Sequence, residues 1–148
     1  MDEDLGPGLD PRHLEDLKER IRRSPFHQWA GIELLTVGGG RAELQLDLLP
    51  HHFNPQGIVH GGVIGAVADT AIGLALRSRL RPGLTHRTAQ LNVHFLTKGD
   101  GNRIIALGQA RHLGQRMGYG EAEVTDPQGN VLARATATFI VLPAPGVF

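Results

Sequence analysis

One stretch of the chain, residues 51–76, contains the only long apolar helix pattern in the sequence. Its apolar residues recur at three- and four-residue spacing, the period of a helix that buries one face: Ile64, Val67, Ala68, Ala71, Ile72 and Ala75. A turn-rich segment, HHFNPQGIVH, precedes this pattern, and Gly61 and Gly62 open it. Because the chain has only one such helix, the remaining elements must cover it.

A single carboxylate, Asp69, interrupts the apolar pattern. Its neighbours one turn away are mostly very small residues: Gly62, Gly65, Ala66, Ile72 and Gly73. A lone carboxylate is costly to bury without compensation, and small neighbours leave room for a ligand or a second backbone. We therefore predict that Asp69 is the working residue of the protein. The alternative is a structural carboxylate satisfied by backbone groups or by Thr70.

Short elements are predicted on both sides of the helix. Residues 1–10 are expected to form a flexible lead-in, and a short amphipathic helix should run from Pro11 to the Ser24-Pro25 boundary, with Phe26 and Trp29 as anchors that pack it onto the body. Strands are expected at 32–37 and 41–48, joined by a glycine hairpin turn, and then at 88–95, 103–111, 119–125 and 131–142. Residues 143–148 should form a tail.

The strand that follows the central helix alternates cleanly. Its apolar face is expected to hold Ala89, Leu91, Val93 and Phe95, and its polar face Thr88, Gln90, Asn92 and His94. An antiparallel sheet of six strands with one long helix to cover it should curl around that helix. The pattern therefore predicts an α+β fold made of one domain, residues 11–142.

Composition narrows the possible partners. The 148 residues carry 15 basic and 15 acidic side chains, so no net field favours nucleic acid or an anionic membrane. The absence of cysteine excludes disulfides and thiol catalysis and fits a reducing compartment. The acidic N-terminus does not resemble a signal peptide, and no run of eighteen apolar residues is present. We expect a cytoplasmic protein with no nucleic-acid or membrane partner.

The central stretch also carries a recognisable motif. In NPQGIVHGG (54–62) an Asn stands six residues before His-Gly-Gly, and Asp69 follows the His by nine residues. This pattern resembles the signature of the hotdog-fold acyl-CoA thioesterases, in particular the branch that contains the phenylacetic-acid-pathway thioesterase. TAQLNV (88–93) and GQR (114–116) resemble later segments of that family, so the resemblance covers residues 28–142. It implies a hotdog fold, in which a curved antiparallel sheet wraps one long helix.

The resemblance implies four catalytic residues. Asp69 would be the general base that activates water, or a nucleophile that forms an anhydride. Gly61 would donate its backbone N–H to the thioester carbonyl, Asn54 would position substrate or water, and the Thr88 hydroxyl would orient the water. Without the resemblance, Asn54 is an ordinary turn residue and Thr88 an ordinary strand residue.

Substrate-binding roles are implied for three further residues. His60 would shape the loop behind the site. Gly62, like Gly61, has no side chain to block the approach of substrate to the helix N-terminus, and Arg116, which matches the family loosely at GQR, would bind a phosphate of coenzyme A. The other arginines considered for the phosphates are Arg77, Arg79, Arg81 and Arg111, and a solvated surface is the alternative for all of them. Coenzyme A enters as part of the substrate, and no cofactor is expected.

Helix geometry predicts a site shared between two chains. Gly61 and Asp69 are eight residues apart, about 12 Å along a helix, so one chain cannot readily place both at the same carbonyl carbon. Two antiparallel helices side by side would place each Asp69 opposite the other Gly61. We therefore predict an obligate dimer with two equivalent sites. The family implies a dimer of dimers, packed either back-to-back or face-to-face.

Three other interpretations remain open. His51, His52 and His60 suggest a metal site, but no HxH or HExxH pattern is present, so no metal is expected. A hotdog hydratase or dehydratase would carry a His soon after the catalytic Asp, and none follows Asp69 in the helix. A non-catalytic acyl-CoA-binding module is the second rival. The sequence leaves open whether the acyl group is aryl or aliphatic.

Overall fold

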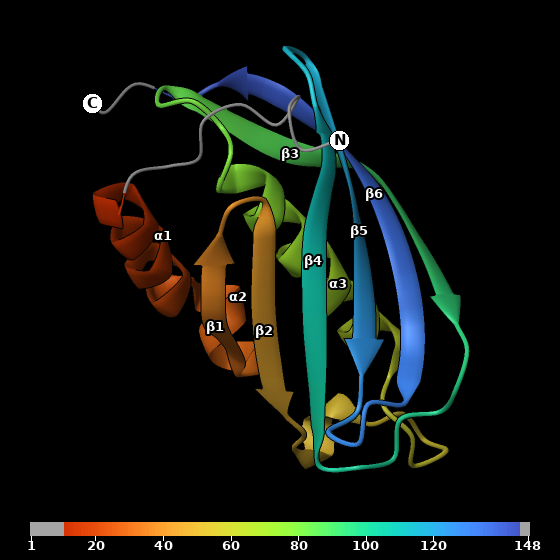
Figure 1. The fold of residues 1–148 in the computed structure, drawn as a ribbon. Coiled ribbons are helices and arrows are strands. Elements are labelled where there is room, and N and C mark those ends of the chain that lie inside the picture. The colour runs from red at the N-terminus through yellow and green to blue at the C-terminus, as the bar shows by residue number, and fades with distance from the viewer. Residues whose placement is uncertain (1–10, 146–148) are drawn as a thin grey trace.

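Helix α3 (Gly61–Arg77) runs through the middle of the molecule, and a six-stranded sheet curves around it (Figure 1). The structure is a computed structural model and describes residues 11–145. The other elements, in chain order, are α1 (Pro11–Arg23), α2 (Pro25–Ala30), β1 (Ile32–Gly38), β2 (Arg41–Asp47), the 3₁₀ turn η2 (Pro50–His52), β3 (Leu84–Phe95), β4 (Arg103–Leu113), β5 (Met117–Thr125) and β6 (Val131–Pro143). The predicted lead-in 1–10 lies outside the described residues, as do residues 146–148 of the predicted tail.

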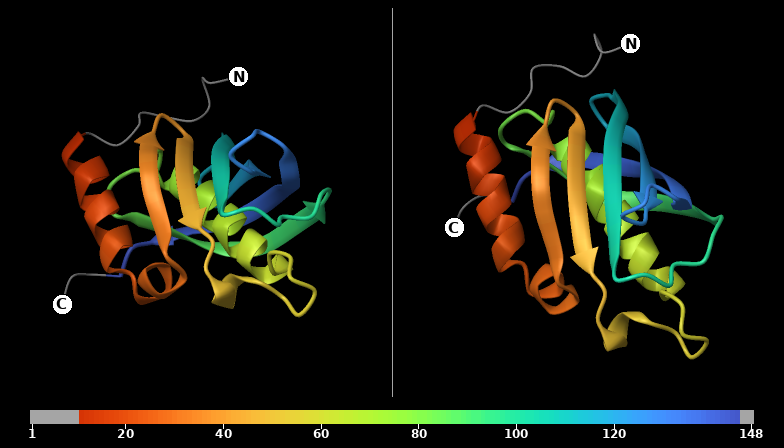
Figure 2. Two further views of the ribbon diagram at one scale, coloured as in Figure 1. Left: turned by 90° about the horizontal axis from the view of Figure 1, so that it is seen from below. Right: turned by 60° about the horizontal axis from the view of Figure 1, so that its bottom comes forward.

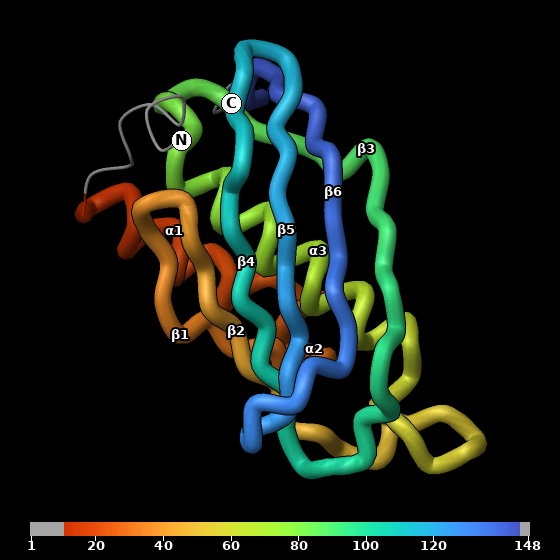
Figure 3. The backbone as a smooth tube through the Cα atoms, turned by 45° about the vertical axis from the view of Figure 1, so that its right-hand side comes forward, coloured from red at the N-terminus to blue at the C-terminus, as the bar shows by residue number. Residues whose placement is uncertain are grey.

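The strands follow the order β1-β2-β4-β5-β6-β3, and every neighbouring pair is antiparallel. Seen from below, the sheet arches over α3, with α1 and α2 near the β1 end (Figure 2). Strand β3 lies at the opposite edge, beside β6 (Figure 3). The predicted architecture, one long helix wrapped by a curved antiparallel sheet with a short N-terminal helix, is confirmed.

The core lies between α3 and the inner face of the sheet. All six apolar residues of the helix pattern are buried, and so are the inward residues Ala42, Leu44 and Leu46 of β2. Helix and sheet come unusually close at Gly108 of β4: a Cβ atom built there would lie 2.2 Å from the carbonyl oxygen of Ala71. The backbone of β4 therefore packs directly on the backbone of α3, which only a glycine allows.

The N-terminal region corrects one prediction. The helix that begins at Pro11 is present and packs Leu17 and Ile21 against the core. Phe26 and Trp29 are not anchors, because they lie on α2 and are 49% and 68% exposed. The sequence reading missed α2, although Ser24 followed by proline at the first helical position is a helix-start signal. The short helix buries Ala30 instead.

Strand ends differ modestly from the predicted ones. The β1–β2 hairpin turns at Gly38-Gly39-Gly40 as expected, and all three glycines have positive φ. Strand β3 begins at Leu84, four residues before the predicted start, and β6 continues through Pro143. No helix within residues 11–145 is long and apolar enough to cross a membrane.

Candidate active site

Among the residues that the structure describes, the first turn of α3 leaves the backbone N–H of Gly61 without an acceptor. The His60 side chain caps the helix: its Nδ1 accepts a hydrogen bond from the Gly62 N–H at 2.8 Å. The His60 carbonyl oxygen accepts from the N–H groups of Val63 and Ile64, at 3.0 and 3.3 Å. Within the described chain the Gly61 N–H has no acceptor, so it can donate to a ligand at the positive end of the helix dipole. The N–H of Gly62 is already engaged.

Asn54 organises the loop that leads to this turn. Its Oδ1 accepts from the N–H groups of Gln56 and Ile58, at 2.9 and 3.3 Å, and its own N–H donates to the Ile58 carbonyl at 2.9 Å. Asn54 is therefore a turn-forming residue, as the alternative interpretation held. It also lines a pocket together with Gly61, and its side-chain NH₂ forms no hydrogen bond within residues 11–145. Its oxygen is fixed, while its donor group stays free for a ligand.

Asp69 and Thr88 meet in the folded chain. The Thr88 hydroxyl donates to Asp69 Oδ1 at 2.8 Å. Asp69 is partly exposed on the open side of α3, the side that the curved sheet does not cover. The second carboxylate oxygen, Oδ2, has no hydrogen-bond partner in the part of the chain that the structure describes. The pair therefore consists of one oxygen held by a hydroxyl and one oxygen free to act on a ligand or a water molecule.

The position of Thr88 corrects the predicted alternation of β3. Thr88 pairs with Phe139 and Gln90 pairs with Thr138, so Ala89 is an extra residue in a β-bulge. Phe139 faces α3, and Thr88 therefore faces α3 as well, whereas the clean alternation placed Thr88 on the polar face with Gln90. A one-residue bulge reverses the faces on its two sides. This bulge brings the hydroxyl to Asp69.

A histidine that the sequence reading missed joins α2 to the helix beside Asp69. His27 Nδ1 lies 2.7 Å from Ser24 Oγ, and His27 Nε2 lies 3.4 Å from Thr70 Oγ1. The Thr70 hydroxyl in turn donates to the Ala66 carbonyl at 2.8 Å. Burial lowers the pKa of His27 below its ordinary value. This network fixes the helical turn that carries Asp69, and no spacing in the sequence signals it.

Arg116 lies far from Gly61 within one chain. It precedes β5 in the β4–β5 hairpin, where it is exposed and forms no ion pair within residues 11–145. Nearby Gly118 packs against Leu76, close to the C-terminal end of α3. Leu76 is about 22 Å along the helix axis from Gly61, so a single chain does not bring Arg116 to the Gly61 N–H.

Two arginines at the C-terminal end of α3, Arg77 in its last turn and Arg79 just beyond it, have structural contacts. Arg77 donates to the Leu84 carbonyl, and burial lowers its pKa from the ordinary value. Arg79 donates to the Gly39 carbonyl at 3.4 Å. These bonds fasten the end of α3 to β3 and to the β1–β2 turn. They make Arg77 and Arg79 poorer candidates for phosphate binding than Arg116.

Two of the three histidines considered for a metal, His52 and His60, use their ring nitrogens in hydrogen bonds of the fold. His52 Nε2 lies 2.7 Å from the Ala30 carbonyl, and its Nδ1 accepts from the Leu49 N–H at 2.9 Å. His60 Nδ1 is used by the helix cap. Among residues 11–145 no group of three His, Cys, Asp or Glu side chains has the geometry of a metal site.

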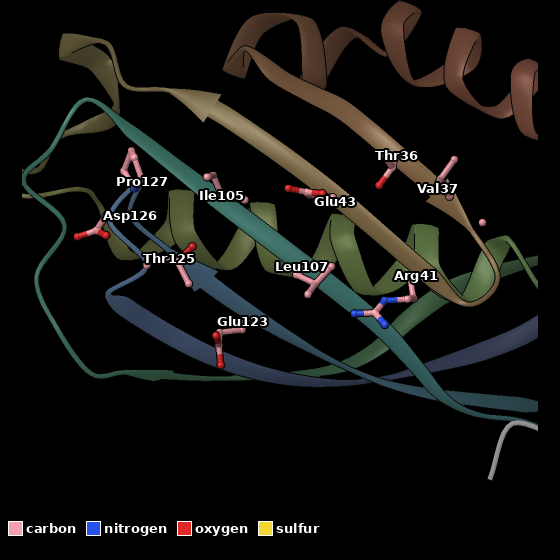
Figure 4. A pocket seen from close by; sticks show the side chains of 12 residues that line it. Thr36, Val37, Arg41, Glu43, Ile105, Leu107, Glu123, Thr125, Asp126 and Pro127 are labelled. Atoms are coloured by element: carbon pink, nitrogen blue, oxygen red, sulfur yellow. The ribbon is translucent and has the colours of Figure 1, made fainter.

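A large cavity lies on the other side of the sheet. It measures about 700 Å³ and opens on the outer face of β2, β4 and β5, with Ile105 and Leu107 at its floor and Glu43 and Glu123 at its sides (Figure 4). None of the predicted site residues lines it, and α3 lies behind the strands in this view. The candidate site is therefore the open side of α3, where Asn54, Gly61, Asp69 and Thr88 lie.

Comparisons with known proteins identify the family. A model described as the thioesterase superfamily matches residues 56–133, more than half of the chain. The medium/long-chain acyl-CoA thioesterase YigI of Salmonella typhimurium is 30% identical over 136 residues, covering 82% of this chain and 88% of that protein. The acyl-coenzyme A thioesterase PaaI of Escherichia coli is 28% identical over 104 residues, covering 70% and 72%. The chain belongs to the thioesterase superfamily.

Solved structures agree with this assignment. The BH2602 protein from Bacillus halodurans, determined with CoA, has a TM-score of 0.75 and 30% identity, and the alignment covers 88% of this chain and 84% of that one. The structure of E. coli PaaI has a TM-score of 0.79 at 22% identity, covering 90% and 94%, and supports the fold. The prediction of a hotdog-fold thioesterase is thus confirmed. The roles of individual residues stay predictions.

Proposed function

We propose that the protein is an acyl-CoA thioesterase, which hydrolyses an acyl-CoA to the free acid and CoA at a site shared by two copies of the chain. The observation that carries the proposal is the distribution of groups along α3: a free N–H at Gly61 and a carboxylate–hydroxyl pair two turns later. Membership of the thioesterase superfamily, relatives named as acyl-CoA thioesterases and a CoA-bound structural neighbour support the substrate class.

Each group has a chemical role in this proposal. The Gly61 N–H binds the thioester carbonyl and stabilises the negative charge that develops on its oxygen during attack. Asp69 either takes a proton from the attacking water or attacks the carbon itself. The Thr88 hydroxyl holds one Asp69 oxygen, so that the other faces the reaction. The Asn54 NH₂ orients the substrate. The C–S bond then breaks: in the general-base route the proton that Asp69 took from water passes to the sulfur, and in the nucleophilic route water hydrolyses the anhydride and supplies the proton with which CoA leaves as the thiol.

The shared site follows from the length of the helix. Gly61 and Asp69 are about 12 Å apart along α3, too far to act on one carbonyl within a chain. An antiparallel copy of α3 brings its own Gly61 opposite Asp69, and the small residues Gly62, Gly65 and Ala66 allow that approach. Strand β3 supports such a dimer, because within residues 11–145 it pairs only with β6 and leaves a long free edge.

The same geometry gives Arg116 a role. In an antiparallel pair, the C-terminal end of one α3 lies beside the N-terminal end of the other. Arg116 therefore approaches an acyl-CoA bound at the Gly61 of the second copy, where its guanidinium can bind a phosphate. The wider proposal includes a dimer of dimers, a single domain over residues 11–142, a cytoplasmic location and no cofactor.

Thiol release from a panel of short, medium, long and aryl acyl-CoAs tests the function. Wild type should turn over, and Asp69→Asn should lose most of the activity while keeping its fold, because the two side chains are nearly isosteric. Gly61→Pro removes the N–H at a position where helices tolerate proline, whereas Gly61→Ala keeps it. Both variants add a Cβ atom that faces Phe95, so the difference between their activities reports the contribution of the N–H. Acyl-CoA binding without turnover of any ester would favour the non-catalytic alternative.

Mixed dimers test the shared site. Co-refolded Asp69→Asn and Gly61→Pro chains should regain activity, because half of the mixed dimers' sites combine an intact Asp69 with an intact Gly61. Each variant alone should stay inactive. Mixed dimers that are verified, folded and inactive would place the site within one chain.

A single turnover in ¹⁸O-labelled water detects an anhydride that water opens at the Asp69 carbon. General-base catalysis puts the label in the product acid of the first turnover, as does water that opens an anhydride at the acyl carbon. An anhydride that water opens at the Asp69 carbon gives unlabelled acid first and leaves the label in the protein.

A further inference from the structure

A pocket of about 320 Å³ adjoins the free N–H of Gly61. It lies between the loop that precedes α3 and the segment that follows β3, and it shares Asn54 and Gly61 with the candidate site. Its apolar lining consists of Ile58, Val59, Ile64, Phe95 and Leu96. A group bound to the Gly61 N–H through a carbonyl oxygen therefore has an apolar space next to it.

Phe95 stands directly beside the carbonyl-binding position. A Cβ built on Gly61 would lie 3.2 Å from Phe95 Cζ and 3.4 Å from Cε1. The Phe95 ring therefore packs against the Cα atom of Gly61, the residue that carries the free N–H. The first carbons attached to a carbonyl at this N–H must pass along the Phe95 ring.

The two walls of the pocket differ in rigidity. Val59 and Ile64 are buried, and the Val59 N–H donates to the Gly99 carbonyl at 2.8 Å, which ties the two loops together. Phe95 and Leu96, by contrast, are 57% and 58% exposed. Large apolar side chains that are exposed beside a functional group are typical of a ligand-binding surface. The inner wall is fixed by the core, and Phe95 and Leu96 form the free wall.

On the basis of the proposed function, we infer that this pocket holds the acyl group, that its ligand is a short- to medium-length aliphatic acyl chain, and that Phe95 limits the length. A volume of about 320 Å³ is near the lower end of the roughly 300–1,000 Å³ of pockets for drug-sized ligands. Phe95 is the only aromatic side chain in the lining, so an aryl group finds one ring to stack on. A flexible chain can follow the gap between the loops.

The test is the chain-length profile of kcat/KM for unbranched acyl-CoAs from two to sixteen carbons, with benzoyl-CoA added. In wild type, each buried methylene should raise kcat/KM about fourfold until the chain reaches the free wall, and the profile should then level or fall. Phe95→Ala should move the optimum at least two carbons longer, and Phe95→Trp should move it shorter. Ile140→Ala, an exposed apolar residue on the outer face of β6, should leave the profile unchanged.

The outcomes separate this inference from the proposed function. If wild type releases no thiol from any ester, the proposed function fails. If wild type is active and Asp69→Asn is not, but the Phe95→Ala profile runs parallel to that of wild type, only the pocket assignment fails. A Phe95→Ala protein with a weakened dimer and an equal loss for every ester would make Phe95 an interface residue and overturn the inference. A preference of wild type for benzoyl-CoA over every aliphatic ester would overturn the ligand class.

Discussion

At the scale of single residues, the hydroxyl of Thr88 fixes the direction of the carboxylate. It holds Asp69 Oδ1 at 2.8 Å and leaves Oδ2 without a partner in the described part of the chain. A hydrogen bond to a charged group contributes about 1.5–3 kcal/mol, which corresponds to roughly ten- to a hundredfold in rate if it acts in the transition state. Asp69 without this bond would turn between rotamers on the open side of α3.

Thr88→Val should therefore lower kcat about ten- to a hundredfold, whereas Thr88→Ser, which keeps the hydroxyl, should stay within a few-fold of wild type. Both should unfold within about 0.5 kcal/mol of wild type, because Thr88 is exposed. Steady-state kinetics and urea unfolding measure the two effects. Equal rates for the Ser and Val variants would leave the hydroxyl without a role in turnover.

The spacing of residues in the sequence predicts the positions of some of these site residues and not of others. The positions of Asp69 and Gly61 follow from helix periodicity, because one periodic element contains both. The contact of Thr88 with Asp69 does not follow, because strict alternation puts Thr88 on the other face and only the bulge at Ala89 reverses it. The Gly61 N–H stays free because the His60 side chain accepts from the Gly62 N–H instead. Capping preferences do not predict this choice, because His is not among the usual N-cap residues.

At the scale of elements, the first turn of α3 depends on an unusual cap. His60 replaces the Ser, Thr, Asp or Asn that usually accepts the free N–H groups of a helix. His60→Ala should reduce the free energy of unfolding by about 1 kcal/mol, and His60→Asn should restore most of it, since Asn also accepts from the backbone. Urea unfolding at one protein concentration measures both. A loss that Asn does not restore would assign the stabilisation to contacts of the ring.

The contact between β4 and α3 makes a sharper prediction. A methyl group at Gly108 would lie 2.2 Å from the Ala71 oxygen and 2.4 Å from its carbon, and backbone atoms cannot turn away as a side chain would. Gly108→Ala should therefore destabilise the fold by about 1–3 kcal/mol or more. Gly101→Ala, where nothing lies within 4 Å, is the control and should change stability by less than about 0.5 kcal/mol. Equal melting temperatures for the two variants would contradict the close packing.

The elements themselves were largely predictable. The central helix, the first hairpin and the four later strands follow from period and turn residues. Helix α2 was missed because Ser24-Pro25 reads equally well as the end of one helix and the start of the next. Its aromatic residues, expected in the interior, are exposed: Phe26 and Trp29 lie three residues apart on one face of α2, and the helix packs on the core through Ala30 instead.

At the scale of the whole molecule, the two sides of the sheet have different chemistry. The outer face carries cross-strand ion pairs, Arg111 with Glu121 at 3.0 Å and Arg134 with Glu123 at 3.2 Å. The open side of α3 carries the small residues Gly62, Gly65 and Ala66 and the free edge of β3. A second copy of the chain can pack its helix closely on these small residues and pair with that free edge. This contrast favours dimerisation through α3 and β3.

The whole fold should also be sensitive to acid, because histidines are buried in it. His52 holds the Ala30 carbonyl with Nε2 and accepts from the Leu49 N–H with Nδ1, so the fold requires its neutral form. Burial lowers the pKa of His52 and of His86 below the ordinary 6.5. Above pH 6.5 these two histidines are neutral in both the folded and the unfolded chain, so their burial takes nothing from the free energy of unfolding. As the pH falls below 6.5, the unfolded chain binds protons that the folded chain does not, and stability is lost until the lowered pKa values are reached.

The free energy of unfolding in urea should therefore be smaller at pH 5.5 than at pH 7.5, at a fixed protein concentration that keeps the assembly constant. His52→Gln keeps a donor and an acceptor but cannot titrate, so it should lose less stability between the two pH values than wild type does, although it starts from a lower value. His112→Gln, on the exposed part of β4, controls for removal of a histidine as such. If His52→Gln and wild type lose the same free energy of unfolding between the two pH values, the acid sensitivity belongs to other groups. The same comparison with His86→Gln then tests His86, which donates to the Gly73 carbonyl at 2.7 Å.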